Sequence, residues 1–195
     1  MNNLDSWKNK GVFDQQLELN IKELNARYPS HWIDNIKLLS TYKPDSILDI
    51  GCGCGAFYEV CKKELPSMKY YGTDYSKDAV RLANKTWGNY FEVLDYKELT
   101  KDFVSNYDVV YLSALLDILP NGDEALEFIL SLNAKQLLIS RVKLVHGESK
   151  YEEYEAYGSI TTYAYYHNIN NFFNIIKKYN YEVVGTNDNF YLIKK

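Results

Sequence analysis

The sequence predicts an α/β protein built on an open, doubly wound and mainly parallel β-sheet. The apolar run 46–50 (Ser-Ile-Leu-Asp-Ile) is typical of a strand buried on both faces, and it leads directly into Gly51, Gly53 and Gly55. Three successive predicted strands also end with an acid, at Asp49, Asp74 and Asp95. The carboxyl ends of parallel strands share one edge of such a sheet, where ligands bind. We therefore expect a ligand site at this edge.

The glycine-rich segment predicts a strand, a tight turn and the start of a helix. Glycine adopts positive φ readily and lets the backbone approach a ligand, while the first amides of the helix stay available for hydrogen bonding. The spacing Gly51-x-Gly53-x-x-Ala56 also fits the turn that binds dinucleotides. Asp49 would be a poor neighbour for a pyrophosphate, so its charge favours a cofactor with a positive group.

The composition is that of an ordinary globular domain. The chain has 195 residues, of which 46% are hydrophobic and 25% charged, and we expect one domain, 1–195. No apolar run approaches the ~18 residues of a membrane span, and the N-terminus lacks the basic start and apolar core of a secretory signal. We expect a cytoplasmic protein that does not bind membranes. The net charge of -4 argues against general nucleic-acid binding. The sequence does not predict an oligomeric state.

The cysteines Cys52, Cys54 and Cys61 lie in or just after the glycine turn. A zinc site would need a fourth ligand and a suitable spacing, so we expect no metal here. We interpret the three thiols as small buried side chains in a reducing compartment.

The first 43 residues predict a helical cap. Apolar residues recur at spacings of three and four over 13–24 and again over 32–39, with Pro29 between the two stretches. We expect this cap, 1–43, to lie near the cleft. Three of its aromatic side chains could close over cofactor or acceptor, namely Tyr28, His31 and Trp32. The alternative for Trp32 is simple packing against the sheet.

The string Leu48-Asp-Ile-Gly-Cys-Gly-Cys-Gly55 resembles the first motif of the class I S-adenosylmethionine-dependent methyltransferases. The resemblance implies that Asp49 orients the methionine end of the cofactor and that the turn passes beneath it. The turn residues concerned are Gly51, Cys52, Gly53 and Gly55. The family also implies a Rossmann-like fold: a seven-stranded, mainly parallel sheet closed by an antiparallel C-terminal hairpin. We therefore divide the rest of the chain into a cofactor-binding core (44–142), an acceptor-region insertion (143–167) and a closing helix and hairpin (168–195).

Further cofactor contacts are expected at the ends of the next strands. Asp74 lies 23 residues beyond Gly51, close to the spacing at which a carboxylate meets a ribose diol, and Tyr75 is placed to pack on adenine. Asp74 could instead cap the helix predicted over 77–87, although Ser76 already offers that cap.

By resemblance, Asp95 and Tyr96 contact the adenine, while Leu112 and Ser113 lie near the sulfonium. Asp95 could equally begin a loop, because Asp is common in turns.

The segment after the fourth strand differs from that of many relatives. Where many small-molecule methyltransferases carry histidines, this chain has Ala114 and Ile118. It also lacks the Asn/Asp-Pro-Pro-Tyr string of amine methylases that act on nucleic acids, which counts against nucleobase N-methylation.

The stretch 141–167 is rich in tyrosine, and in the family this region builds the acceptor pocket. We expect acceptor contacts from Arg141, Tyr157 and Tyr163 together with Tyr28 and Trp32 of the cap. His146 and His167 are the candidate general bases, since histidine titrates near neutrality. The alternative is that these tyrosines serve as core residues, as many of the 19 in the chain must.

We therefore expect transfer of a methyl group from S-adenosyl-L-methionine to a hydroxyl of a small molecule or sugar, with S-adenosyl-L-homocysteine as product. The segment 138–184 also resembles bacterial methyltransferases associated with surface-polysaccharide genes, which points to a glycan. A binding module without catalysis and a nicotinamide-dependent oxidoreductase are the alternatives.

Overall fold

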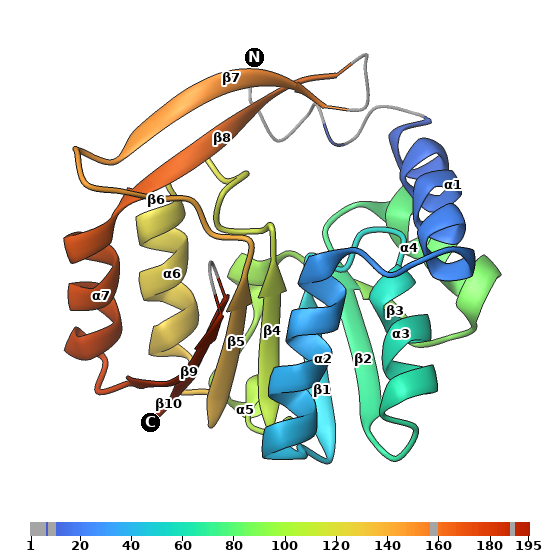
Figure 1. The fold of residues 1–195 in the computed structure, drawn as a ribbon, viewed down its shortest axis with the longest axis horizontal. Helices are drawn as coiled ribbons and strands as arrows, with labels where there is room; N and C mark the ends of the chain where they lie inside the picture. The colour runs from blue at the N-terminus through green and yellow to red at the C-terminus, as the bar shows by residue number, and fades with distance from the viewer. Residues whose placement is uncertain (1–6, 8–10, 157–159, 188–189) are drawn as a thin grey trace.

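The computed structural model describes residues 7, 11–156, 160–187 and 190–195 (Figure 1). Its helices are α1 (Val12–Asn25), α2 (Ser30–Tyr42), α3 (Ala56–Glu64), α4 (Lys77–Trp87), the 3₁₀ turn η2 (Tyr96–Glu98), α5 (Lys101–Val104), α6 (Gly122–Ser131) and α7 (Ile169–Lys178). Its strands are β1 (Ser46–Ile50), β2 (Lys69–Asp74), β3 (Phe91–Val93), β4 (Val109–Ser113), β5 (Gln136–Ser140), β6 (Leu144–Val145), β7 (Lys150–Ala156), β8 (Ile160–Asn168), β9 (Glu182–Asn187) and β10 (Phe190–Lys194).

The described residues form a seven-stranded sheet in the order β3-β2-β1-β4-β5-β10-β9. β1 pairs in parallel with both β2 and β4, whereas β10 runs antiparallel to β5 and β9. The predicted fold class is therefore confirmed, including the antiparallel C-terminal pair. The strand order reverses at β1, so the crossover helices leave on opposite faces and open a crevice at the carboxyl ends of β1 and β4.

The strand period of two decides which core each side chain joins. Ile47 and Leu138 point to the face covered by α2 and α3, where they pack with Leu39 and Val60. The residues adjacent to them on each strand, Leu48 and Leu137, pack instead beneath α6 and α7, in the cluster that also contains Leu126 and Phe172. Both faces of the central strands are buried, which is why their sequences are continuously apolar.

Two helix starts show how local sequence sets the element boundaries. The Ser76 hydroxyl accepts a hydrogen bond from the Ala79 N–H (3.3 Å), so α4 begins and ends as predicted. The Asn168 side chain caps α7 by accepting from the Asn171 N–H (2.8 Å). The Ser76 cap fixes the chain direction just after Asp74, at the rim of the sheet.

The tyrosine-rich insertion folds as a long hairpin of β7 and β8, which we call the arm, with β6 paired alongside β8. Figure 1 shows the arm arching above the carboxyl ends of the central strands, from α7 toward α1. Tyr151 stacks on Tyr163 with ring centroids 4.7 Å apart. The Lys143 ammonium lies 5.2 Å from the ring centroids of both Tyr154 and Tyr166. Tyrosine thus supplies cross-strand packing within the arm.

None of the helices within the described residues is both long enough and apolar enough to pass through a bilayer.

Candidate functional site

The glycine turn after β1 has a left-handed backbone at each of its glycines. The φ values are 76° at Gly51, 55° at Gly53 and 75° at Gly55. A Cβ on Gly53 would lie 2.7 Å from Oε1 of Gln16. The positive φ disfavours a larger side chain here, so the turn leaves its backbone open to a ligand.

The cap is attached directly to this turn. Oε1 of Gln16 accepts a hydrogen bond from the Cys54 N–H (3.1 Å), and Nδ2 of Asn20 donates to the Cys54 sulfur (3.3 Å). On the other side, the Trp87 indole donates to the Cys54 carbonyl (2.9 Å). Burial raises the pKa of the Cys54 thiol to about 11, so the thiol stays neutral. The amphipathic pattern predicted α1 but not these contacts, because side-chain pairing between distant segments leaves no local signal.

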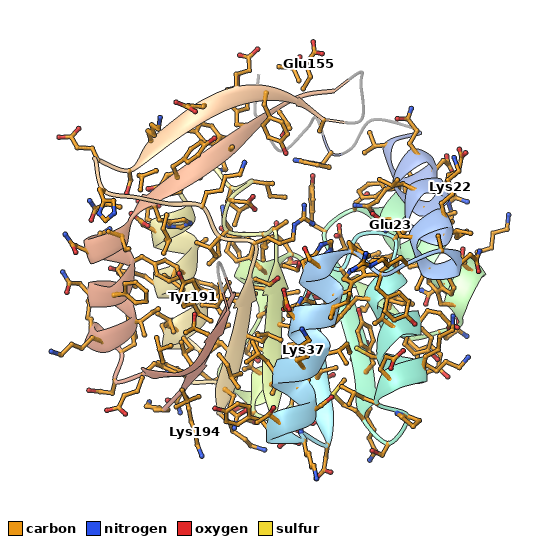
Figure 2. The ribbon with its side chains drawn as sticks, in the orientation of Figure 1. Lys22, Glu23, Lys37, Glu155, Tyr191 and Lys194 are labelled. Carbon is orange, nitrogen blue, oxygen red and sulfur yellow. The ribbon has the colours of Figure 1, made fainter. Side chains whose placement is uncertain are left out.

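The described residues around the turn line three adjoining hollows at the sheet edge. The first, about 180 Å³, includes Asp49, His31, Trp32, Tyr111 and Arg141. Trp32 is buried and also lines the hollow, a position that is compatible with both interpretations made for it. Figure 2 shows Glu23, another residue of this hollow, on the inward side of α1, while Lys22 points outward. This hollow is where the predicted methionine end of the cofactor would lie.

Asp49 is almost fully buried, at 3% exposure, and the Tyr70 hydroxyl donates to its Oδ2. Burial raises the pKa of Asp49 to about 7, although the Tyr70 hydrogen bond and the nearby Asp74 also act on it, in opposite directions. His31 behaves in the converse way: burial and the Arg141 charge lower its pKa to about 4. At neutral pH the hollow therefore holds a neutral imidazole and a carboxylate that titrates near the physiological range.

The second hollow is small and mainly apolar. It is lined by Asp74, Tyr75, Asp95 and Tyr96, the residues predicted for ribose and adenine, together with Leu94, Leu115, Ile118 and Leu119. Asp95 also accepts from the Lys97 N–H (3.0 Å) and caps η2, so its two proposed roles are geometrically compatible. No sequence motif indicated that the four apolar residues would line this hollow.

Asp74 accepts hydrogen bonds from the N–H groups of Gly53 (2.9 Å) and Ser76 (2.8 Å). Burial raises its pKa to about 6, and these two hydrogen bonds offset part of the effect. Its carboxylate thereby ties the end of β2 to the glycine turn. Oxygen lone pairs beyond these two bonds remain for a diol.

The third hollow, about 300 Å³, joins the other two and opens beneath the arm. Its floor includes Gly51, Ser113 and Asp117, and the arm contributes Tyr154 and Ala156. Two non-glycine residues that line it, Ala114 (φ 51°) and Arg141 (φ 63°), have left-handed backbones. Such conformations persist only where the surrounding structure holds them, and they often occur at ligand sites.

Some predicted site residues lie elsewhere. Leu112, expected beside the sulfonium, is 1% exposed and packs in the core under α6, because it and Ser113 face opposite sides of β4. Tyr28 packs edge-on against Trp32 (6.1 Å between ring centroids) and Tyr163 stacks on Tyr151, and neither is among the described residues that line the hollows. Tyr157 lies outside the described residues.

The structure does not bring the two candidate bases to the hollows. His146 is exposed between β6 and β7, and the described lining does not include it. His167 is fully buried, with Nδ1 2.6 Å from Oδ1 of Asp123 and its ring against Phe172. A histidine enclosed by core side chains has no path to an acceptor, so we do not retain either residue as a base.

The residues of the hollows that were not predicted as site residues include Asp117, Tyr154 and Gln16. Asp117 follows β4 in the segment where related methyltransferases carry histidines, so its place in the sequence could have identified it as a candidate site residue. Tyr154 is one of many tyrosines in the sequence, and only the position of the arm in the structure shows that it lines the third hollow.

Known proteins share both the sequence pattern and the architecture. Residues 48–138 match a family model described as a methyltransferase domain. The sugar N-methyltransferase KedS8 from Streptoalloteichus sp ATCC 53650 is 10% identical, with a TM-score of 0.61 over 92% of this chain and 92% of that chain. Streptomyces venezuelae DesVI is 13% identical, with a TM-score of 0.60 over 91% and 94%. The N-terminal domain of EvdMO1, solved with S-adenosylhomocysteine bound, is 14% identical, with a TM-score of 0.59 over 83% and 78%. These likenesses show the fold.

The plantazolicin methyltransferase BpumL is 25% identical over 70% of this chain, with a TM-score of 0.48, and the chain spans 58% of its length. A search of the curated proteins finds no match.

The segment that matches the family runs from β1 into β5 and contains the glycine turn, Asp74, Asp95 and Ser113. This match favours a methyltransferase over a nicotinamide-dependent oxidoreductase as the interpretation of the turn. The left-handed glycines, the buried carboxylates at the strand ends and the apolar hollow beside them fit an adenosyl group and a cationic methionine end. Residues 48–138 are thus similar to a methyltransferase domain, and the described part of the chain has the Rossmann-like fold of S-adenosylmethionine-dependent methyltransferases.

Proposed function

We propose that this enzyme methylates a hydroxyl group of a small molecule or sugar. The observation that supports this most strongly is the third hollow, which adjoins the glycine turn and lies between the sheet edge and the arm. Its volume of about 300 Å³ suits a small molecule held beside the cofactor, whose expected contacts Asp74 and Tyr75 also line it. The polar groups Ser113, Asp117 and Arg141 and the aromatic Tyr154 line it, a combination that suits a polyhydroxylated ring.

The cofactor supplies a methyl group already activated on a sulfonium, so the protein has to bind, orient and desolvate. Asp49 would face the ammonium of the methionine end, and that positive charge would favour the ionised carboxylate. Asp74 would accept hydrogen bonds from the ribose hydroxyls while its bonds to Gly53 and Ser76 hold it in place. Leu94 and Leu115 would cover the adenine.

The arm's part is to position the acceptor and exclude water. Holding the acceptor in line with the methyl group converts an encounter of two molecules into a reaction within one complex. Tyr154 is the aromatic side chain through which the arm reaches the third hollow. Its ring also faces the Lys143 ammonium at 5.2 Å, which restricts its orientation.

A sugar is the preferred acceptor class within this proposal. The fold is shared with a sugar N-methyltransferase and with an EvdMO1 domain crystallised in the presence of D-fucose, and these likenesses support a sugar acceptor. The resemblance to polysaccharide-associated methyltransferases points the same way.

The first test is calorimetric titration with S-adenosylhomocysteine, with NAD as the control ligand. We expect selective binding of S-adenosylhomocysteine, weakened about 10- to 100-fold in Asp74→Ala because hydrogen bonds to a buried carboxylate are lost. Asp78→Ala is the matched control: Asp78 is an exposed acid on α4, paired only with Arg81 (3.6 Å) among the described residues, and its loss should leave binding unchanged.

The second test is methyl transfer from methyl-labelled S-adenosylmethionine to a panel of sugars, amino sugars, nucleoside-diphosphate hexoses and phenols. We expect label in an O-methyl ether of a sugar, with Asp74→Ala reducing the label on every acceptor. Label found only on amines would contradict the hydroxyl assignment. Binding of S-adenosylhomocysteine with no transfer to any member would instead favour a non-catalytic module.

A further inference from the structure

Asp117 is a buried carboxylate without an assigned role. It lies four residues beyond the end of β4, is 7% exposed and lines the third hollow. Among the described residues its Oδ1 has no hydrogen-bond partner. Burying an unsatisfied carboxylate is unfavourable, and native structures retain such groups where a ligand or a reaction uses them.

The backbone around Asp117 is fixed from two sides. The Ala114 N–H donates to the Ser140 carbonyl (3.1 Å), which holds the left-handed turn after β4 against β5. The Asp117 carbonyl accepts from the Tyr165 N–H (2.6 Å), which joins this segment to β8 of the arm. The carboxylate is therefore held at the junction between the sheet edge and the arm, where the acceptor would enter.

The charges around Asp117 come from three other segments. Burial raises its pKa, while Arg141 after β5, Lys143 before β6, a hydrogen bond from its own backbone N–H and His167 on β8 act in the opposite direction. The net direction is upward, which makes the carboxylate a stronger proton acceptor than an exposed aspartate.

We propose that Asp117 is the general base that removes the proton from the acceptor hydroxyl. This inference rests on the proposed function. In the step, the hydroxyl proton passes to an oxygen of Asp117 as the acceptor oxygen bonds to the methyl carbon. The carbon–sulfur bond breaks and its electron pair stays on sulfur, which leaves S-adenosylhomocysteine, the methyl ether and a protonated Asp117.

The other carboxylate and imidazole groups of the cleft either accept backbone hydrogen bonds or lie outside the third hollow. Of the carboxylates that line the third hollow, Asp74 receives the N–H groups of Gly53 and Ser76 and faces the ribose position. His31 lines the first hollow, not the third. Asp117 thus combines a free oxygen with a place on the acceptor side of the cleft.

Two cofactor analogues, sinefungin and S-adenosylhomocysteine, can test whether Asp117 lies beside the transferred methyl group, and this test needs no known acceptor. Sinefungin resembles S-adenosylhomocysteine but carries an amine where the transferred methyl group would be, and that amine is protonated near neutrality. We expect wild-type protein to bind sinefungin more tightly than S-adenosylhomocysteine, and Asp117→Asn to reduce this preference about tenfold, because a charge-assisted hydrogen bond is lost. S-adenosylhomocysteine itself should bind the variant as well as it binds the wild type.

Asp95→Asn is the matched control, since it removes a carboxylate at the adenine end of the same cleft. It should weaken both ligands by the same factor and leave their ratio unchanged. An unchanged ratio in Asp117→Asn, with S-adenosylhomocysteine still bound, would overturn the assignment. Failure of the wild type to bind S-adenosylhomocysteine would instead refute the cofactor site on which the proposed function depends.

With a hydroxyl acceptor from the panel, Asp117→Asn should lower kcat about 100-fold or more, with little change in KM for S-adenosylmethionine. Asp117→Glu should recover part of kcat, because it restores the carboxylate at a slightly different position. A kcat near that of the wild type in Asp117→Asn would rule out the base.

Discussion

The ionised carboxylates of Asp49 and Asp74 lower the stability of the folded protein but favour ligand binding. In the unfolded chain an aspartate titrates near 3.8, whereas burial raises the folded pKa to about 7 for Asp49 and about 6 for Asp74. Between these values the folded state binds more protons than the unfolded state, so the contribution of each group to stability falls as pH rises. Ligand binding has the opposite preference, because an ammonium or a diol is best held by the ionised carboxylate.

We therefore predict that Asp49→Asn is more stable than the wild type at pH 8, and that the difference shrinks as pH falls toward 5. Each unmatched proton changes the free energy of unfolding by about 1.4 kcal/mol per pH unit. The measurement is urea unfolding of both proteins from pH 5 to 8. S-adenosylhomocysteine affinity should fall about tenfold in the variant.

Comparison of the two proteins is needed because His31, whose pKa burial lowers to about 4, has the opposite dependence. Its contribution to stability is lost as pH falls below its unfolded value of 6.5. Asp78→Asn, at an exposed position of α4, is the control and should show no pH-dependent difference. A constant difference between Asp49→Asn and the wild type at every pH would show that Asp49 titrates normally.

At the scale of elements, the arm depends on one acid of α6. Asp123 accepts hydrogen bonds from side chains that precede β7, lie on β8 or belong to α7: Ser149 (3.1 Å), Tyr165 (3.1 Å), His167 (2.6 Å) and Asn171 (2.7 Å). Burial alone would raise the pKa of Asp123, but the hydrogen bonds from His167, Asn171 and Ser149 and the charge of His167 together outweigh it and lower the pKa. His167, first considered for catalysis, thus helps to attach the arm.

We predict that Asp123→Ala destabilises the protein by on the order of 3 kcal/mol, because buried donors lose a charged partner. Urea unfolding measures the loss, and limited proteolysis should cleave the variant within the arm before the rest of the chain. Glu127→Ala, on the same helix, removes an exposed ion pair with Lys178 (3.1 Å) and should cost less than ~1 kcal/mol. Equal effects of the two substitutions would show that the Asp123 contacts do not hold the arm.

On the scale of the whole molecule, the site draws on segments far apart in sequence. α1 contributes Gln16, β1 contributes Asp49, the segment after β4 contributes Asp117, and the arm contributes Tyr154. The buried Asn35 of α2 also donates to the Tyr111 hydroxyl of β4 (2.6 Å) and to Ser140 of β5 (3.2 Å). Cap, sheet and arm should therefore respond to the cofactor together.

We predict one cooperative thermal transition for the chain, consistent with the proposed single domain 1–195. S-adenosylhomocysteine at about 100 times its Kd should stabilise the folded state by ~2.7 kcal/mol and raise Tm, whereas NAD should not. Hydrogen exchange should slow in α1 as well as in α3. Protection confined to the glycine turn and α3 would show that the cap is not part of the cofactor site.

The strand and helix pattern of this protein is local, and so it was open to prediction from the residues. The apolar run of β1, the glycines after it and the Ser76 cap of α4 each act over a few residues, and the predicted fold is confirmed. Asp74, Tyr75, Asp95 and Tyr96 share one hollow because parallel strands must end at one edge.

The residues on the acceptor side of the cleft could not be predicted from local sequence signals. The arm's path over the cleft, the burial of His167 against Asp123 and the unpaired Asp117 oxygen all depend on contacts between segments tens of residues apart. A tyrosine in the arm and a tyrosine in the core look alike in sequence, and so do a titratable side chain in a cleft and one in a core. Their roles follow from burial and from the partners around them, which arise only when the chain packs.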